Sequence, residues 1–153
     1  KDDDKIVMDV VSRCGAAVQF ASPRLKQDRR IALAAVKNDG EALQYLPNFK
    51  SDREIVLEAV MQNGLALRHA DKVFFSDKEI VINVLSQKQS TYLIIFISED
   101  LKDDRDVILA AYKVNKAYLQ YASERLKDEF RIEMIKSYAD ALLGEVKENS
   151  KKR

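Results

Sequence analysis

A segment that opens on an aspartate recurs along this chain, and its spacing limits the possible folds more than any other feature. The opening residues are Asp3, Asp28, Asp52, Asp77 and Asp104, so the steps are 25, 24, 25 and 27 residues. The clearest copy reads DREIVLEAV from Asp52, followed by Asn63-Gly64. A fixed period of roughly 20–50 residues is typical of stacked repeats, in which each unit buries its apolar face against its neighbours.

Each copy is predicted to form two short helices. The opening aspartate is a good N-cap, because its carboxylate can accept hydrogen bonds from the free amides of the first turn. Ile55 and Ala59 lie four residues apart and share one side of a helix, and the same holds for Val56 and Val60. Such a wide apolar face predicts burial between two neighbours.

Glycines at matching places are expected to end the first helix in the left-handed conformation, namely Gly15, Gly40 and Gly64. A second short helix should follow. A loop with one apolar anchor should then complete the copy, the anchors being Leu25, Phe49, Phe74, Leu101 and Leu126.

The sequence therefore predicts an all-α fold in which tandem short helix-pair repeats stack as an α-solenoid-like array. One domain of residues 1–153 should hold repeats near 3–27, 28–51, 52–76, 77–103 and 104–128, with a capping helix near 129–147. The Lys-then-Asp junction at residues 101–105 resembles the first residues of the chain. We therefore expect the chain to begin inside a longer array and to be a fragment of a longer protein.

Composition narrows the class of function. The 26 basic and 25 acidic residues give a net charge of +1, which argues against a uniformly basic nucleic-acid binder. Cys14 is the single cysteine, so no disulfide can form within the chain. That favours a reducing compartment, either the cytoplasm or, for a secreted effector, the host cytosol. The longest apolar run, residues 92–97, is too short to span a bilayer.

The sequence predicts no catalytic, cofactor-binding or metal-binding residues. His69 takes the place of an aromatic residue in the other copies, which favours a structural role, although a functional one stays open. Cys14 lies near a helix C-terminus, where a reactive thiolate is not expected. Residues 100–111 do not match a calcium loop, because Arg105 and Ala111 stand where glycine and glutamate are needed.

One segment of the fourth copy breaks the pattern of the others. Ile95 stands at a place that is polar in the other four copies, where the residues are Gln19, Gln44, Arg68 and Gln120. With Leu93 beside it, Ile95 is predicted to form an exposed apolar patch, and such patches often mark partner surfaces. We predict that Tyr92, Leu93 and Ile95 bind a partner. The alternative is that this irregular copy rotates its helix and buries them.

The string that opens at Asp52, together with LQYAS at residues 119–123, resembles an uncharacterised tandem helical-repeat family, a domain of unknown function. Units of this type occur in arrays in protist and bacterial proteins, some of which resemble secreted effectors. The resemblance covers residues 3–128. It implies a helical repeat fold without enzymatic activity, and it brings no catalytic or cofactor residues. The fourth copy departs most, because it has two additional residues and no Asn-Gly.

The leading hypothesis is a non-catalytic scaffold for protein–protein recognition within a larger, effector-like protein. One alternative is an RNA-binding helical repeat that reads one base per unit, and the glutamines at matching places are a faint indication of it. Another alternative is an accessory region of an enzyme whose catalytic domain lies elsewhere in the parent chain.

Overall fold

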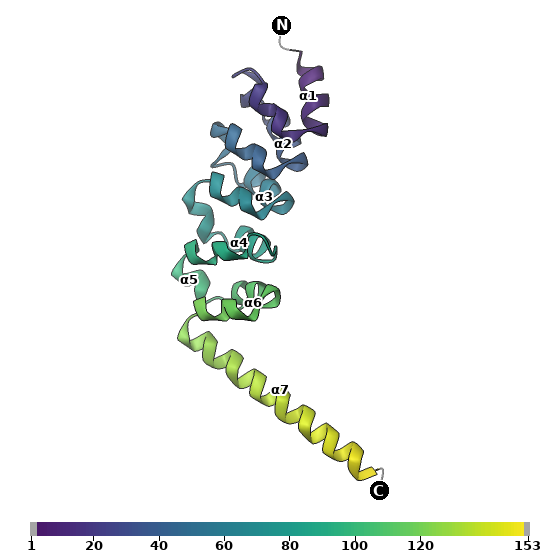
Figure 1. The fold of residues 1–153 in the computed structure, drawn as a ribbon. Coiled ribbons are helices and arrows are strands. Elements are labelled where there is room, and N and C mark those ends of the chain that lie inside the picture. The colour runs from purple at the N-terminus through teal and green to yellow at the C-terminus, as the bar shows by residue number, and fades with distance from the viewer. Residues whose placement is uncertain (1–2, 152–153) are drawn as a thin grey trace.

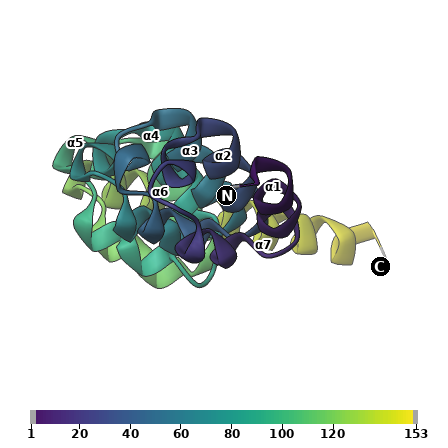
Figure 2. The ribbon, with the colours of Figure 1, turned by 90° about the horizontal axis from the view of Figure 1, so that it is seen from above.

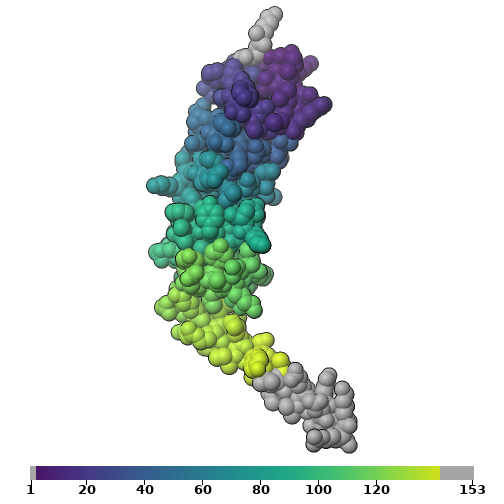
Figure 3. Space-filling view, viewed as in Figure 1, coloured from purple at the N-terminus to yellow at the C-terminus, as the bar shows by residue number. Residues whose placement is uncertain are grey.

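The computed structural model describes residues 3–151, and side chains as far as residue 141. The repeats stack in chain order into an elongated rod (Figures 1 and 3). The first helices of the five repeats are α1 (Asp4–Arg13), α2 (Arg29–Asn38), α3 (Arg53–Gln62), α4 (Lys78–Leu85) and α6 (Arg105–Val114). Every regular element within residues 3–151 is helical, which confirms the all-α prediction.

The second helix of each repeat is a six-residue 3-10 helix and not an α-helix. These are η1 (Gly15–Phe20), η3 (Gly40–Tyr45), η5 (Gly64–His69), η7 (Thr91–Phe96) and η8 (Lys116–Tyr121). A 3-10 helix has three residues per turn, so residues three apart lie on the same side. Gly40, Leu43 and Leu46 have this spacing and are all buried, which explains why the tighter helix suits these segments.

The predicted anchor loop is a third short helical turn. These turns are η2 (Leu25–Gln27), η4 (Pro47–Phe49), η6 (Lys72–Ser76) and α5 (Glu99–Lys102). Each holds its anchor side chain in the core, as Leu25 and Phe74 illustrate. Each of the first four repeats therefore consists of an α-helix, a 3-10 helix and a short helical turn, where the sequence had predicted a helix pair and a loop.

The aspartate caps form as predicted. The Asp52 carboxylate accepts hydrogen bonds from the amides of Glu54 and Ile55 at 3.1 and 3.2 Å, and each of the other four opening aspartates also accepts from at least one amide of its first turn. Behind each cap the apolar face is buried: Ile55 and Val56 are fully enclosed. Stacking thus supplies the burial that a helix of ten residues cannot obtain alone.

The glycines serve a purpose different from the predicted one. No glycine among the described residues has a positive φ, so the left-handed helix stop is wrong. A Cβ at Gly15 would lie 2.3 Å from the carbonyl oxygen of Ala35, and one at Gly40 would lie 2.3 Å from that of Ala59. Glycine is required there because the backbone of the next repeat passes too close to admit any side chain.

The terminal helix begins five residues before its predicted start. Helix α7 (Glu124–Lys151) leaves the stack as a long single helix (Figures 1 and 2). Ser123 caps it, and the anchor Leu126 lies within its first turns. At the place of the next capping aspartate the chain has Glu129. Glutamate is not among the favoured N-caps, so the anchor turn runs on into the helix that follows without a break.

Candidate functional site

Neighbouring repeats are joined by an amide clamp, in which one amide side chain binds the backbone of the preceding repeat twice. The Asn38 Oδ1 accepts from the Gly15 amide at 2.7 Å, while Nδ2 donates to the Ser12 carbonyl at 3.1 Å. Gln62 binds Gly40 in this way, with an N···O distance of 2.6 Å, and Gln87 binds Gly64 at 2.7 Å. Each clamp satisfies an amide at the start of a 3-10 helix that has no partner within its own helix.

The clamp is absent where the fourth repeat meets the fifth. We call the start of each 3-10 helix, where the clamp binds, the corner of the repeat. The glycine at the corners of the first three repeats is replaced by Thr91 in the fourth, and the amide side chain of the clamp is replaced by Val114. The Thr91 amide donates to the Gln87 carbonyl of its own repeat at 3.0 Å. The glycine and the amide side chain of the clamp are thus both replaced, and the backbone amide at the start of η7 finds its acceptor within the fourth repeat.

An ionic ladder links the N-termini of successive first helices. Arg53 donates to the capping Asp77 at 2.7 Å and to Glu79 at 2.6 Å, both in the next repeat. The same pattern recurs in two neighbouring pairs, Arg29 with Asp52 and Glu54, and Lys78 with Asp104 and Asp106.

These contacts change the acidity of the capping carboxylates. Hydrogen bonds from Arg53 lower the pKa of Asp77 below its ordinary value. Desolvation raises the pKa of Asp52, but the hydrogen bonds from Arg29 and from the helix amides outweigh it and leave that pKa lowered. All these groups reach solvent. We therefore regard the ladder as a set of contacts that align each repeat with the next, and not as a reactive site.

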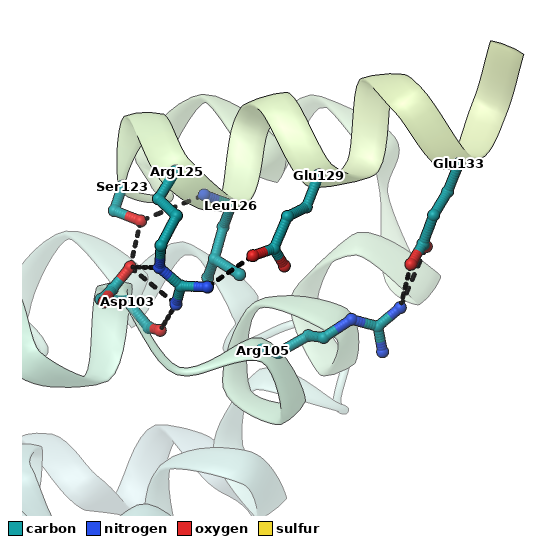
Figure 4. A network of polar contacts seen from close by, with 7 residues as sticks. All are labelled: Asp103, Arg105, Ser123, Arg125, Leu126, Glu129 and Glu133. Carbon is teal, nitrogen blue, oxygen red and sulfur yellow. Dashed lines mark hydrogen bonds and ion pairs between the residues drawn. The ribbon is translucent and has the colours of Figure 1, made fainter.

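Helix α7 is attached to the end of the fourth repeat and to α6 of the fifth by a separate polar network (Figure 4). Arg105 donates to both carboxylate oxygens of Glu133, at 2.8 and 2.9 Å. Arg125 donates to the Asp103 carbonyl at 2.8 Å and to Glu129 at 2.6 Å. These contacts fix the first turns of α7 on the stack.

A groove of about 430 Å³ lies between the third and fourth repeats and is the candidate binding site. Its lining comes from η5, η6, η7 and the residues between them: Arg68, Ala70, Lys72, Phe75, Leu93 and Phe96. The rings of Phe75 and Phe96 meet edge to face, with centroids 6.2 Å apart. An apolar lining with a few polar groups at its edge is typical of a binding pocket.

Two departures from the repeat pattern build this groove. Phe75 stands where the other four copies have lysine, namely Lys26, Lys50, Lys102 and Lys127. Leu93 stands where the first three copies have alanine, namely Ala17, Ala42 and Ala66. Phe75 was not among the predicted binding residues, although alignment of the anchor residues places this phenylalanine where the other four copies have lysine.

The three residues predicted to bind a partner fall into two groups. Tyr92 and Ile95 are 45% and 48% exposed, and the neighbouring Phe96 is 58% exposed. Leu93 is only 3% exposed, so its predicted exposure is wrong. The reason is that Leu93 occupies the place of Ala42 and Ala66, which are fully buried in their own repeats.

The basic edge of the groove includes one internal ion pair. Arg68 donates through Nη2 to the Glu41 carboxylate and through Nε to His69, 3.2 Å from Nε2. Desolvation raises the pKa of Glu41, but the hydrogen bond from Arg68 and the contact with His69 outweigh it and leave the pKa lowered. Glu41 Oε1 is buried without a hydrogen-bond partner in the described structure. Lys72 makes no ion pair with the described residues.

His69 is half-buried in the aromatic place of its repeat, as predicted. The structure adds Glu41 as a partner 3.2 Å from its Nε2, which sequence reasoning did not find because the two residues lie in different repeats. Cys14 is exposed. Among the described residues no group of three or more metal-ligating side chains comes together, and no described helix is long and apolar enough to cross a bilayer.

Comparison with known proteins yields one result. Neither a curated protein nor a solved structure matches the chain. One family matches four times in overlapping tandem, over residues 3–50, 28–75, 52–92 and 77–127. Each match starts at a capping aspartate, and three of them span two repeats, so the family unit is a pair of repeats. The chain belongs to the family described as Domain of unknown function (DUF4116).

Proposed function

We propose that this chain is a non-catalytic scaffold that recognises another protein through the groove between η6 and η7. The observation that carries the proposal is the loss of the repeat pattern at one place: a lysine is replaced by Phe75, and a polar residue is replaced by Ile95. Sequences are expected to break their local rules at functional sites. Solvent-exposed apolar side chains weaken solubility, so their concentration here favours a surface that becomes covered.

The surroundings of the groove support a protein partner. Ile95 and Phe96 are about half exposed, and Val73 on η6 is exposed as well. Aromatic side chains and arginine are enriched in protein interfaces, and the groove combines Phe75 and Phe96 with Arg68. A groove of about 430 Å³ can hold one or two side chains of a partner.

The repeats supply their own test variants. Phe75→Lys and Ile95→Gln restore residues that the other copies already carry at the same places, so both should leave the stack folded. Met61→Gln is the matched control, because Met61 is also an exposed apolar residue but does not line the groove. We expect peptides selected by display on the wild-type chain to bind the double variant at least roughly tenfold more weakly.

Unchanged affinity of the double variant, or an equal loss with Met61→Gln, would contradict the proposal. Retention on immobilised RNA that falls with salt and is insensitive to Phe75→Lys would favour the RNA-binding alternative. Measurable turnover by the purified chain in a substrate screen would contradict a non-catalytic role. A catalytic domain in the parent protein would support the role of an accessory region.

A further inference from the structure

We infer that the groove takes an acidic peptide segment, which inserts an apolar side chain against Phe75 and Phe96 and places carboxylates against Arg68 and Lys72. This inference rests on the proposed function and adds the chemical class of the partner.

The charge of the groove is the first argument. Both charged residues in its lining, Arg68 and Lys72, are basic. Asp71 lies between them in the sequence, but its carboxylate accepts a hydrogen bond from Ser51 of the second repeat. The Lys72 ammonium has no ion pair with the described residues. A carboxylate in the groove would therefore meet two cations and no anion of the lining.

The hydrogen-bonding capacity of Arg68 is the second argument. A guanidinium has five N–H donors in a planar fork that fits a carboxylate in a bidentate manner. Nε donates to His69 and Nη2 to Glu41, while Nη1 makes no hydrogen bond with the described residues. The side chain is half exposed. Arg68 thus holds an internal carboxylate on one side and still offers donors to a second one.

The apolar floor selects a peptide over other anions. A free phosphate or a metabolite carboxylate would leave Phe75, Leu93 and Phe96 uncovered. A single-stranded nucleic acid could stack on the rings, but it needs a run of cations along its backbone, and this groove offers two. A peptide that alternates apolar and acidic side chains would cover the apolar residues of the groove and pair with its two basic residues at the same time.

The test begins with a random peptide library displayed on phage and selected on the full chain, with counter-selection on the Phe75→Lys/Ile95→Gln variant. We expect enriched peptides to carry an aliphatic or aromatic residue and an excess of Asp and Glu. The most enriched peptide is then labelled and titrated by fluorescence anisotropy. Arg68→Gln and Lys72→Gln should each weaken its binding roughly three- to tenfold, and added salt should weaken it further.

One variant distinguishes recognition from a structural effect. Glu41→Gln removes the carboxylate that competes for Arg68, so it should tighten binding of the acidic peptide severalfold, opposite in sign to Arg68→Gln. A variant that only loosened the fold would weaken binding, and the far-UV circular dichroism melt of each variant checks this.

Enriched peptides without an acidic excess, or a Glu41→Gln variant that binds more weakly although it melts like the wild type, would overturn the inference and leave the proposed function standing. Absence of any enrichment over the counter-selected variant would overturn both. Selective, salt-dependent retention of single-stranded RNA that Phe75→Lys abolishes would assign the groove to nucleic acid instead.

Discussion

The second and third repeats and the fourth repeat are built from the same elements but are joined in different ways. In the second and third, the next repeat leaves no room for a side chain at the glycine, because Gly40 lies against the Ala59 carbonyl and Gly64 against the Ser90 side chain, and an amide clamp binds the glycine amide. In the fourth, the corner carries Thr91, the clamp is missing, and two residues are added. The two regular repeats are joined to the next repeat through a clamp, whereas the irregular one is not and exposes three neighbouring apolar side chains, Tyr92, Ile95 and Phe96. Stability and recognition are thus located in neighbouring parts of one rod.

The largest expected effect is at a glycine corner. Gly40→Ala places a methyl group 2.3 Å from the carbonyl oxygen of Ala59, so the two repeats must separate. We expect a loss of about 2–3 kcal/mol in the free energy of unfolding, measured by urea denaturation. Lys116→Ala is the control, because Lys116 holds the same place in the fifth repeat and is exposed. A Gly40→Ala variant as stable as this control would break the comparison between the two kinds of corner.

The clamp comes next. Gln62→Ala leaves the Gly40 amide without its acceptor and should lower the free energy of unfolding by about 1–2 kcal/mol. The reverse change, Val114→Gln, supplies the amide that the irregular corner lacks. It should not stabilise the chain, because the Thr91 amide is already bound to Gln87. Stabilisation by Val114→Gln would show that the missing clamp alone distinguishes the two corners.

The ionic ladder gives a smaller, pH-dependent effect. The pKa values of Asp52, Asp77 and Asp104 are lower in the folded chain than the ordinary value of 3.8. Their contribution to stability is therefore complete above the unfolded pKa and is lost as the pH falls through the folded pKa values. Arg53→Gln should reduce the drop in melting temperature between pH 6 and pH 3. An unchanged drop would show that the ladder contributes nothing measurable.

The smallest effect should be at the exposed residue of the irregular repeat. Ile95→Gln replaces a half-exposed side chain by the residue of three other copies, so the free energy of unfolding should change by less than about 0.5 kcal/mol. A loss comparable to that of Gln62→Ala would mean that Ile95 is needed for stacking, and the separation of stability from recognition would fail.

The sequence allowed the period, the aspartate caps and the buried face of the first helix to be predicted, because each depends on residues within one repeat. Features that depend on the next repeat were missed. Gly40 resembles a helix stop when read alone, and only the Ala59 carbonyl shows why it is glycine. The amide clamp pairs residues 22 apart or more, which no local motif reveals.

The groove was predicted in part for the same reason. Ile95 could be recognised from the sequence because the other four copies have a polar residue at the same place. Leu93 was assigned to the surface because it lies near Ile95, although the residues at its place in the second and third copies, Ala42 and Ala66, are apolar and buried. The start of α7 could have been found from Glu129, since a missing capping aspartate indicates that a helix does not restart.

The gap in the series of clamps has a mechanical consequence. In a rod whose units contact only their neighbours, every junction bears the whole of a pulling force. The junction between the fourth and fifth repeats, immediately beside the groove, has no amide clamp, and its contacts include the hydrogen bond from the Ser123 amide to the Lys102 carbonyl at 3.1 Å. A partner in the groove would therefore bind beside a junction that carries this force without the clamp of the three junctions before it.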